Sequence, residues 1–212
     1  EPYLDALDRL LDLIEALEAE GIRIGHVDVG GGLGITYTDE TPPAAGALVA
    51  RLLARIEARG HGHRELLFEP GRSLVGNAGV LLTQVLVLKP GEPKNFCIVD
   101  AAMNDLVRPA MYDAYMRIVP CTLRQTGVEP RAWDVVGPVC ESGDWLGRER
   151  RLAVQPGDHL AVLSAGAYAM SMASNYNSRP RAAELMVDGA RAFVIRARES
   201  VQDLFAHETL LD

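Results

Sequence analysis

The sequence contains few lysines and cysteines. Lys89 and Lys94 are the only lysines among 212 residues, and arginine supplies the remaining basic side chains. The three cysteines, Cys97, Cys121 and Cys140, form no C-x-x-C pair and are odd in number. This pattern argues against a disulfide framework and against a zinc site, and it predicts a cytoplasmic protein.

Long apolar runs and an excess of positive charge are also absent. No run approaches the roughly 18 apolar residues that a membrane span needs, and residues 1–5 lack the basic start and apolar core of a signal peptide. The net charge of −8 argues against nucleic acid as a partner. No acidic or cysteine side chain lies at ligand spacing from His61 and His63, so we expect no metal site.

The first third of the chain alternates helical and strand patterns. Apolar residues recur at three- and four-residue steps over 3–20, which predicts an amphipathic helix that ends at Gly21. A strand over 22–29, a second helix over 43–59 and a short buried strand over 66–68 follow. This order is typical of a βα-barrel or a doubly wound α/β sheet.

From about residue 79 the pattern changes to short strands separated by turns. Two strands, over 80–88 and 95–100, flank a turn rich in proline and glycine, which predicts a β-hairpin. We expect a mainly antiparallel β-sandwich or small barrel here, and hence two domains, residues 1–78 and 79–212. The other expected elements are strands over 116–123, 133–139, 160–163 and 192–198, helices over 105–115 and 200–211, and turns at 127–130 and 155–158.

The first domain has too few strands to form a barrel by itself. Two βα units cannot close a barrel of eight strands. An open parallel edge with an apolar pattern also promotes aggregation. We therefore expect the chain to be the back half of a longer protein.

Glycine is concentrated where the first predicted strand ends. Gly30, Gly31 and Gly32 follow that strand, and consecutive amides without Cβ atoms can form a cradle for an anion. The pattern is neither G-x-G-x-x-G nor a P-loop. The next strand ends in Glu69 and Arg72, on either side of a Pro-Gly bend. Together these ends predict a site for a phosphorylated cofactor at the open end of a parallel barrel, with a plain turn as the alternative.

Five groups of residues, in this order, resemble the diaminopimelate decarboxylases. These are pyridoxal-phosphate enzymes of the group that shares the alanine-racemase and ornithine-decarboxylase fold, and the resemblance extends over essentially the whole chain. It implies the last strands of a (β/α)8 TIM-type barrel followed by a mainly antiparallel β-domain with short helices. The matching segments are HVDVGGGLGI (26–35), EPGR (69–72), NDLVRPAMY (104–112), CESGD (140–144), and GAY (166–168) through NYNSRP (175–180).

The resemblance places one catalytic group outside this sequence. The family's Schiff-base lysine, and the imidazole that stacks on its cofactor, belong to early barrel strands that this sequence does not include. Lys89 and Lys94 fall in the predicted hairpin turn and are poor substitutes. We therefore expect the isolated chain to be inactive.

The same resemblance implies cofactor-binding roles. Gly30–Gly32 and Gly71 would bind the phosphate of pyridoxal 5′-phosphate through backbone N–H groups. Glu69 would face the pyridine nitrogen and keep it protonated, because opposite charges stabilise each other in a site of low dielectric constant. Arg72 and Tyr168 would also contact the cofactor. The alternatives are a surface carboxylate for Glu69 and a core tyrosine for Tyr168.

Substrate binding is implied for Arg72, Arg108, Tyr112 and Tyr168. Arginine presents a planar fork that matches a carboxylate in two hydrogen bonds. A decarboxylase of ornithine or arginine must instead receive a cationic distal group. Arg108 therefore favours a substrate with a second carboxylate, and a solvated cation is the alternative interpretation.

A third set of residues would act across a dimer interface. Cys140 is the family's candidate proton donor to the substrate carbon after CO2 leaves, and Glu141 would bind the distal amino group of the substrate. Asp144 would support this loop or the interface. The alternative for Cys140 is an inert buried thiol.

The expected function is the conversion of meso-2,6-diaminopimelate to L-lysine and CO2 by a pyridoxal-phosphate-dependent homodimer. Two alternatives remain. One is a non-catalytic fragment that binds phosphate or a partner chain. The other is a related decarboxylase of a carboxylated polyamine precursor.

Overall fold

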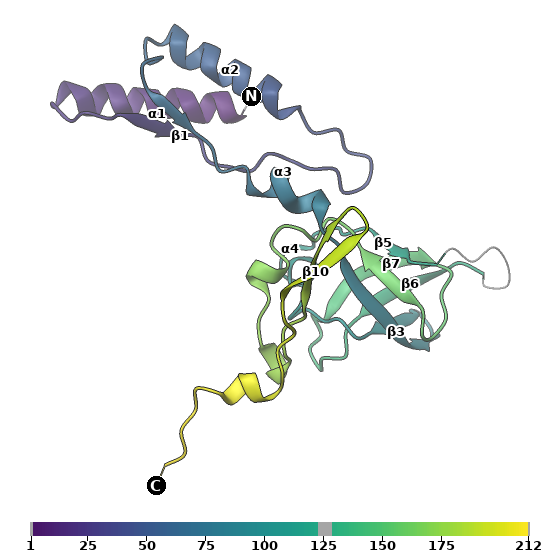
Figure 1. Ribbon diagram of the computed structural model, residues 1–212. Coiled ribbons are helices and arrows are strands. Elements are labelled where there is room, and N and C mark those ends of the chain that lie inside the picture. The colour runs from purple at the N-terminus through teal and green to yellow at the C-terminus, as the bar shows by residue number, and fades with distance from the viewer. Residues whose placement is uncertain (1, 123–128, 212) are drawn as a thin grey trace. The chain divides into compact units, whose positions relative to one another are not determined.

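The computed structural model describes residues 2–122 and 129–211. The chain forms two compact units, Glu1–Asn77 and Ala78–Asp212 (Figure 1). No helix in the described residues is long and apolar enough to cross a membrane.

The first unit combines helices with two short parallel strands. Its elements are α1 (Pro2–Ala19), β1 (His26–Asp28), α2 (Ala45–Ala58), β2 (Glu65–Leu67) and α3 (Gly71–Val75), and the 3-10 turn Gly76–Ala78 follows at the boundary with the second unit. The strands pair in parallel with Val27 opposite Leu66, which confirms the predicted alternation of helix and strand. β1 is shorter than the strand predicted over 22–29, since it pairs with β2 over only three residues, and β2 is exposed to half-buried, not buried as predicted.

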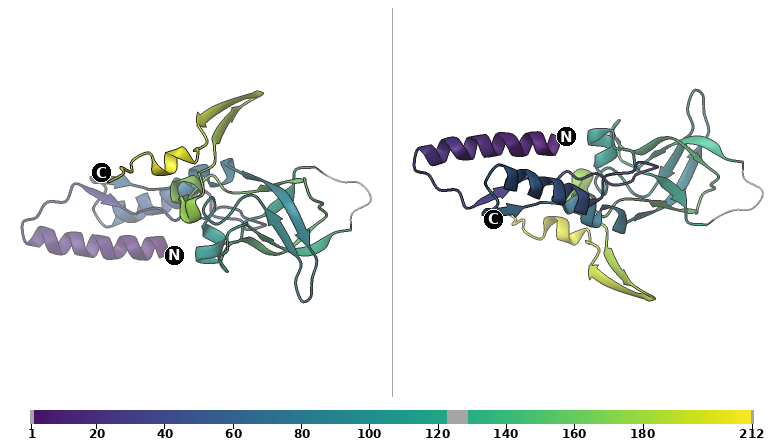
Figure 2. Two further views of the ribbon diagram at one scale, coloured as in Figure 1. Left: turned by 90° about the horizontal axis from the view of Figure 1, so that it is seen from below. Right: turned by 90° about the horizontal axis from the view of Figure 1, so that it is seen from above.

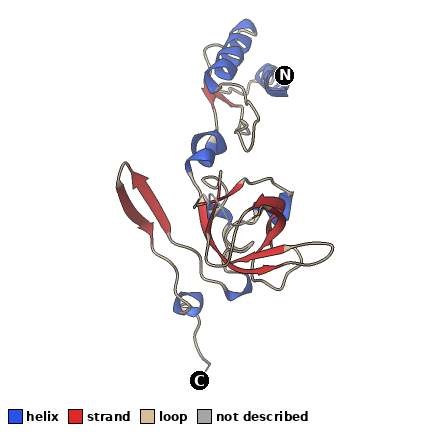
Figure 3. Cartoon of the chain, turned by 90° about the vertical axis from the view of Figure 1, so that its right-hand side faces the viewer, coloured by secondary structure: helices blue, strands red, loops and turns tan. Residues whose placement is uncertain are grey.

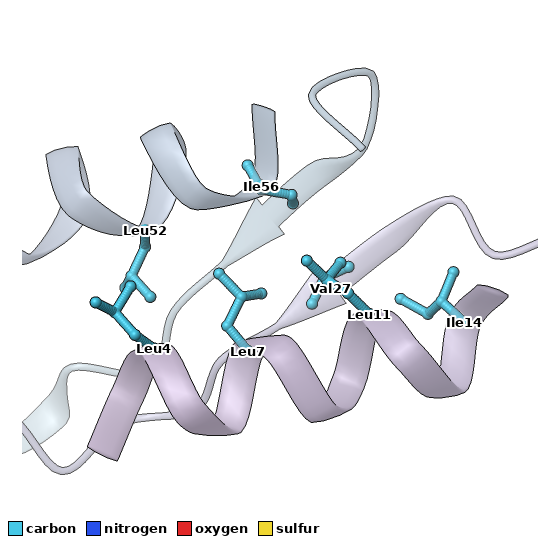
Figure 4. Close-up of a cluster of buried hydrophobic side chains, with 7 residues drawn as sticks. All are labelled: Leu4, Leu7, Leu11, Ile14, Val27, Leu52 and Ile56. Carbon is cyan, nitrogen blue, oxygen red and sulfur yellow. The ribbon is translucent and has the colours of Figure 1, made fainter. Parts of the chain in front are cut away.

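The core of the first unit lies between α1, α2 and β1. One face of α1 buries Leu4, Leu7, Leu11 and Ile14, and Figure 2 shows α1 and α2 running alongside each other. Burying side chains of this size contributes about 1.5–3 kcal/mol each. The helical spacing seen in the sequence therefore marks the face that packs. The full cluster comprises Leu4, Leu7, Leu11, Ile14, Val27, Leu52 and Ile56 (Figure 4).

Polar side chains link α1 to the segment that follows α2. Arg59 forms ion pairs with Asp12 and Glu15, each at 2.8 Å. The buried ring of His61 lies between Glu15, 3.0 Å from Nε2, and Arg64, whose Nε donates to Nδ1 at 3.1 Å. Hydrogen bonds from His61 and Arg59 lower the pKa of Glu15. His61 is thus part of the packing between these elements.

The second unit is built on a six-stranded mixed sheet. Its strands are β3 (Leu81–Lys89), β4 (Phe96–Val99), β5 (Ile118–Pro120), β6 (Arg131–Val136), β7 (Trp145–Leu152) and β8 (His159–Val162). The order is β5-β8-β3-β4-β6-β7, and only the β4–β6 pair is parallel. The two end strands, β5 and β7, contact each other, so the sheet curls into a nearly closed barrel (Figure 3). The predicted β3–β4 hairpin and the mainly antiparallel character are confirmed.

Several predicted boundaries in this unit differ from the structure. The helix expected over 105–115 is the short α4 (Arg108–Tyr112), which ends where Asp113 adopts a φ of 51°. The helix expected over 200–211 is only a 3-10 turn at Gln202–Phe205. The apolar residue Leu211 that follows it is 99% exposed. The predicted strand end at 123 and the start of the turn at 127 lie outside the described residues.

Two strands were not predicted. β7 carries three arginines and one glutamate among eight residues, so it lacks the apolar alternation of a strand. β9 (Glu184–Asp188) pairs with β10 (Arg191–Arg196) in a separate antiparallel ribbon (Figures 2 and 3). Both faces of this ribbon carry exposed apolar side chains, Leu185, Val187 and Val194 on one face and Met186 and Phe193 on the other.

Candidate functional site

The glycine-rich turn lies beside the turn that carries Glu69. Backbone hydrogen bonds continue the pairing of β1 and β2 beyond the strands, from Val29 N to Leu67 O at 3.1 Å and from Glu69 N to Gly30 O at 2.9 Å. Parallel strands present their carboxyl ends at one edge of a sheet. The two predicted halves of the cofactor site therefore meet at that edge.

Glycine is favoured at each position of this turn for a structural reason that the backbone shows. Gly30 and Gly32 adopt φ values of 71° and 90°, which disfavour any residue with a Cβ. A Cβ atom on Gly31 would overlap the backbone carbonyl of Glu69. Close approach of the two turns thus depends on Gly31.

The amides of this turn are not equally available to a ligand. The Gly30 amide donates to Asp28 Oδ1 at 2.8 Å, and the Gly71 amide donates to Glu69 O at 3.0 Å. The amides of Gly31 and Gly32 donate no hydrogen bond to any described residue. An anion would therefore find its best donors at these two glycines.

Arg72 lies against the same turn. Its Nη2 is 3.4 Å from the Gly32 carbonyl, and its buried Nε has no hydrogen-bond partner among the described residues. Glu69 is exposed at the end of β2. Two open amides beside a guanidinium fit a phosphate group, because charge-assisted hydrogen bonds to phosphate are strong.

The second unit brings three predicted substrate residues together. The Arg108 guanidinium lies 5.0 Å from the centre of the Tyr168 ring and 5.7 Å from that of Tyr112. Its Nε is buried and has no hydrogen-bond partner in the part of the chain that the structure describes. Aromatic faces attract the cation and leave its N–H edge for a planar anion.

Tyr168 is held in an unusual backbone conformation. Its φ of 61° is uncommon for a residue with a Cβ, and strained residues of this kind cluster at functional sites. The turn that carries it is anchored where the Ala165 amide donates to Gly79 O at 2.9 Å. Tyr168 is 41% exposed, so it is not a core tyrosine.

Cys140 and Glu141 lie on the loop between β6 and β7. Both are exposed, so the Cys140 thiol is not buried. The hydroxyl of Tyr176 donates to Glu141 Oε2 at 3.4 Å. The Glu141 carboxylate raises the pKa of that hydroxyl, which therefore stays protonated as a donor. The sequence alone did not single out Tyr176, because the contact spans 35 residues.

One family matches this chain over residues 8–166, described as "Pyridoxal-dependent decarboxylase, C-terminal sheet domain". The chain belongs to the pyridoxal-dependent decarboxylases. It is similar to the diaminopimelate decarboxylase of Vibrio cholerae, with 54% identity over 210 residues that cover 99% of this chain and 49% of the relative. It thus spans about half the length of the curated relatives it matches.

Solved structures of diaminopimelate decarboxylases are also similar to this chain. The diaminopimelate decarboxylase of M. jannaschii in co-complex with L-lysine is 37% identical with a TM-score of 0.89, covering 99% of this chain and 49% of that one. The Helicobacter pylori enzyme complexed with L-lysine is 39% identical with a TM-score of 0.85, covering 97% of this chain and 50% of that one. The chain therefore has the fold of the C-terminal half of this family.

The glycine turn can be tested by adding one methyl group. In the full-length protein, we expect Gly31→Ala to lower the free energy of unfolding by about 1–3 kcal/mol, because the new Cβ overlaps the Glu69 carbonyl. Urea denaturation measures this change. Gly46→Ala is the matched control, since a Cβ there meets nothing within 4 Å. Equal midpoints for Gly31→Ala and the wild type would show that the turns are not in close contact.

Proposed function

We propose that the protein containing this chain is a pyridoxal-phosphate-dependent diaminopimelate decarboxylase that converts meso-2,6-diaminopimelate to L-lysine and CO2. Curated relatives named diaminopimelate decarboxylase, at 54% identity, support this assignment. Solved structures of the M. jannaschii and Helicobacter pylori enzymes hold L-lysine, the product of the proposed reaction. Residues 1–78 would be the closing part of a (β/α)8 barrel, and residues 79–212 its β-domain.

The cofactor is proposed to bind at the carboxyl ends of β1 and β2. The Gly31 and Gly32 amides and the Arg72 guanidinium would hold the phosphate, while Gly30 and Gly71 shape the two turns. The Glu69 carboxylate would keep the pyridine nitrogen protonated. When bound, pyridoxal phosphate supplies the electron sink that decarboxylation requires.

The proposal for the substrate rests on the surroundings of Arg108. A guanidinium beside two tyrosine rings, with a buried and unpartnered Nε, is prepared to bind a carboxylate in two hydrogen bonds. The hydroxyl groups of Tyr112 and Tyr168 can add further donors. A substrate whose distal end carries an ammonium group but no carboxylate would leave this guanidinium without its anionic partner. This arrangement favours diaminopimelate over ornithine.

The loop of Cys140 and Glu141 would complete the site. The Glu141 carboxylate would bind the distal ammonium group of the substrate. The Cys140 Sγ would deliver a proton to the α-carbon once CO2 has left. Exposure of both residues supports these roles, since each can reach a ligand outside its own loop.

We further propose a cytoplasmic homodimer in which this loop enters the partner's site. Exposed apolar side chains on the β9–β10 ribbon, such as Val187 at 69% and Val194 at 67%, support a protein–protein contact. Free thiols at Cys121 and Cys140 support a reducing compartment.

We propose that the isolated 212 residues do not decarboxylate. Lys94 Nζ donates to Asp134 at 2.8 Å in an ion pair, so this amine is engaged within the β-domain. Lys89 ends β3 at the predicted hairpin turn. Neither lysine supports covalent binding of the cofactor. A non-catalytic binding role is the alternative for the isolated chain.

The full-length protein should release CO2 and L-lysine from meso-2,6-diaminopimelate, and the isolated chain should release neither. We expect Arg108→Lys to lower kcat/KM by about 10- to 100-fold, because one charged hydrogen bond contributes roughly 1.5–3 kcal/mol. Arg151→Lys, on an exposed position of β7, is the matched control. Lysine release and CO2 capture measure both effects.

Three results would contradict this account. The first is a full-length protein that decarboxylates ornithine or a carboxylated polyamine but not diaminopimelate. The second is CO2 release by the isolated chain. The third is an equal effect of Arg108→Lys and Arg151→Lys.

Sharing of sites can be tested by mixing inactive variants. Under the proposal, Glu141→Ala damages the partner's site and Arg108→Ala damages the protomer's own. Randomly assorted hybrid dimers then hold one intact site each, so refolding an equal mixture should restore roughly a quarter of wild-type activity. A mixture no more active than the separate variants would show that both residues serve the same protomer's site.

A further inference from the structure

A buried carboxylate connects the Cys140–Glu141 loop to the segment that precedes α4. Asp144 is only 3% exposed. Its Oδ1 accepts the Met103 amide at 2.7 Å, and its Oδ2 accepts the Val139 amide at 2.8 Å. One side chain therefore satisfies backbone donors from two segments far apart in the sequence.

The backbone of Asp144 closes the same loop. Its amide donates to Glu141 O at 3.0 Å, and its carbonyl accepts the Gly137 amide at 3.0 Å. The Glu141 side chain in turn accepts the Gly143 amide at 3.2 Å. Asp144 thus sets the path of the loop at Glu141 in two ways. Its amide bonds directly to Glu141 O, and its carbonyl joins the two ends of the segment 137–144.

Gly137 makes room for this carboxylate. A Cβ there would lie 2.7 Å from Asp144 Oδ1, closer still to Oδ2, and 2.8 Å from the Ala101 carbonyl. Gly137 has no positive φ, so its backbone conformation does not require glycine. The need for glycine here comes from the space that the Asp144 carboxylate and the Ala101 carbonyl occupy.

Met103, which donates its amide to Asp144, lies just before the helix that begins at Arg108. Met103 lies in a compact turn in which the Asp105 and Leu106 amides donate to Ala102 O at 2.9 and 3.2 Å. Leu106 is fully buried, and α4 begins two residues later at Arg108. The Met103 bond therefore holds the base of α4 to the loop of Glu141.

We propose that Asp144 is a positioning residue for the decarboxylation, acting through Glu141. It holds the Glu141 carboxylate at the place where the distal ammonium group of the substrate binds, without touching the substrate. This inference rests on the proposed function. A carboxylate suits the role because both oxygens accept, whereas an asparagine amide would point N–H groups at one of the two backbone donors.

Substrate preference in the full-length protein tests the inference. The comparison uses kcat/KM for meso-2,6-diaminopimelate and for 2-aminopimelate, which lacks the distal amino group. We expect Asp144→Asn to lower the value for diaminopimelate by about 10- to 100-fold, since misplacing a positioned group by 1 Å can cost about 100-fold. The value for 2-aminopimelate should fall less, because only the loss that passes through Glu141 depends on the distal amino group, so the preference for diaminopimelate is lost. Asp5→Asn, an exposed position on α1, is the control.

A double variant identifies the route of the effect. In a Glu141→Gln background the preference is already lost, so adding Asp144→Asn should reduce it no further. Gly137→Ala, which presses on the same carboxylate, should reproduce the loss, with Gly46→Ala as its control. Circular dichroism and thermal unfolding verify that each variant is folded.

The following results would overturn the role proposed for Asp144. Equal decreases for both substrates, or an undiminished effect of Asp144→Asn in the Glu141→Gln background, would make Asp144 a general structural residue. Failure of both Asp144→Asn and Gly137→Ala to fold would have the same meaning. A wild-type protein without activity on diaminopimelate would instead contradict the proposed function.

Discussion

The parallel pairing of β1 with β2 is the constraint on which the candidate cofactor site depends. It places the glycine turn against the turn of Glu69, with Glu69 N bonded to Gly30 O at 2.9 Å. The carbonyl of Glu69 then occupies the space that a Cβ at Gly31 would need. Gly31 is therefore required by packing between turns as well as by any ligand, and the two open amides follow from that packing.

In the second unit, charged groups on exposed segments are held in place by their neighbours. Arg108 is fixed by the rings of Tyr112 and Tyr168, and Glu141 is fixed by backbone bonds that centre on Asp144. In both cases neighbouring groups of the same unit hold in place the charged group that is proposed to bind the substrate. Preorganisation of this kind lowers the entropic cost of binding.

Periodicity in the sequence was sufficient for α1 and α2 and for the strand ends that carry the glycine turn, but not for the helices expected over 105–115 and 200–211. It failed for β7, where Arg148 lies 3.8 Å from the centre of the Trp145 ring and Arg150 lies 3.9 Å from that of Tyr115. These arginines cover aromatic faces, so a strand can form without apolar alternation. The Arg108–Tyr168 and Asp144–Met103 contacts join distant residues, and only the folded chain brings them together. The candidate roles came from the family resemblance, while the distinction between open and engaged amides is visible only in the folded chain.

The most direct test of the account is the affinity of the full-length protein for pyridoxal 5′-phosphate compared with pyridoxal, measured by equilibrium titration of the cofactor absorbance. The account predicts that the phosphorylated form binds at least about 100-fold more tightly, because each hydrogen bond to a charged group contributes roughly 1.5–3 kcal/mol. It also predicts that Arg72→Met removes much of this difference. Equal affinities for the two compounds would contradict the assignment of the glycine turn as the phosphate site.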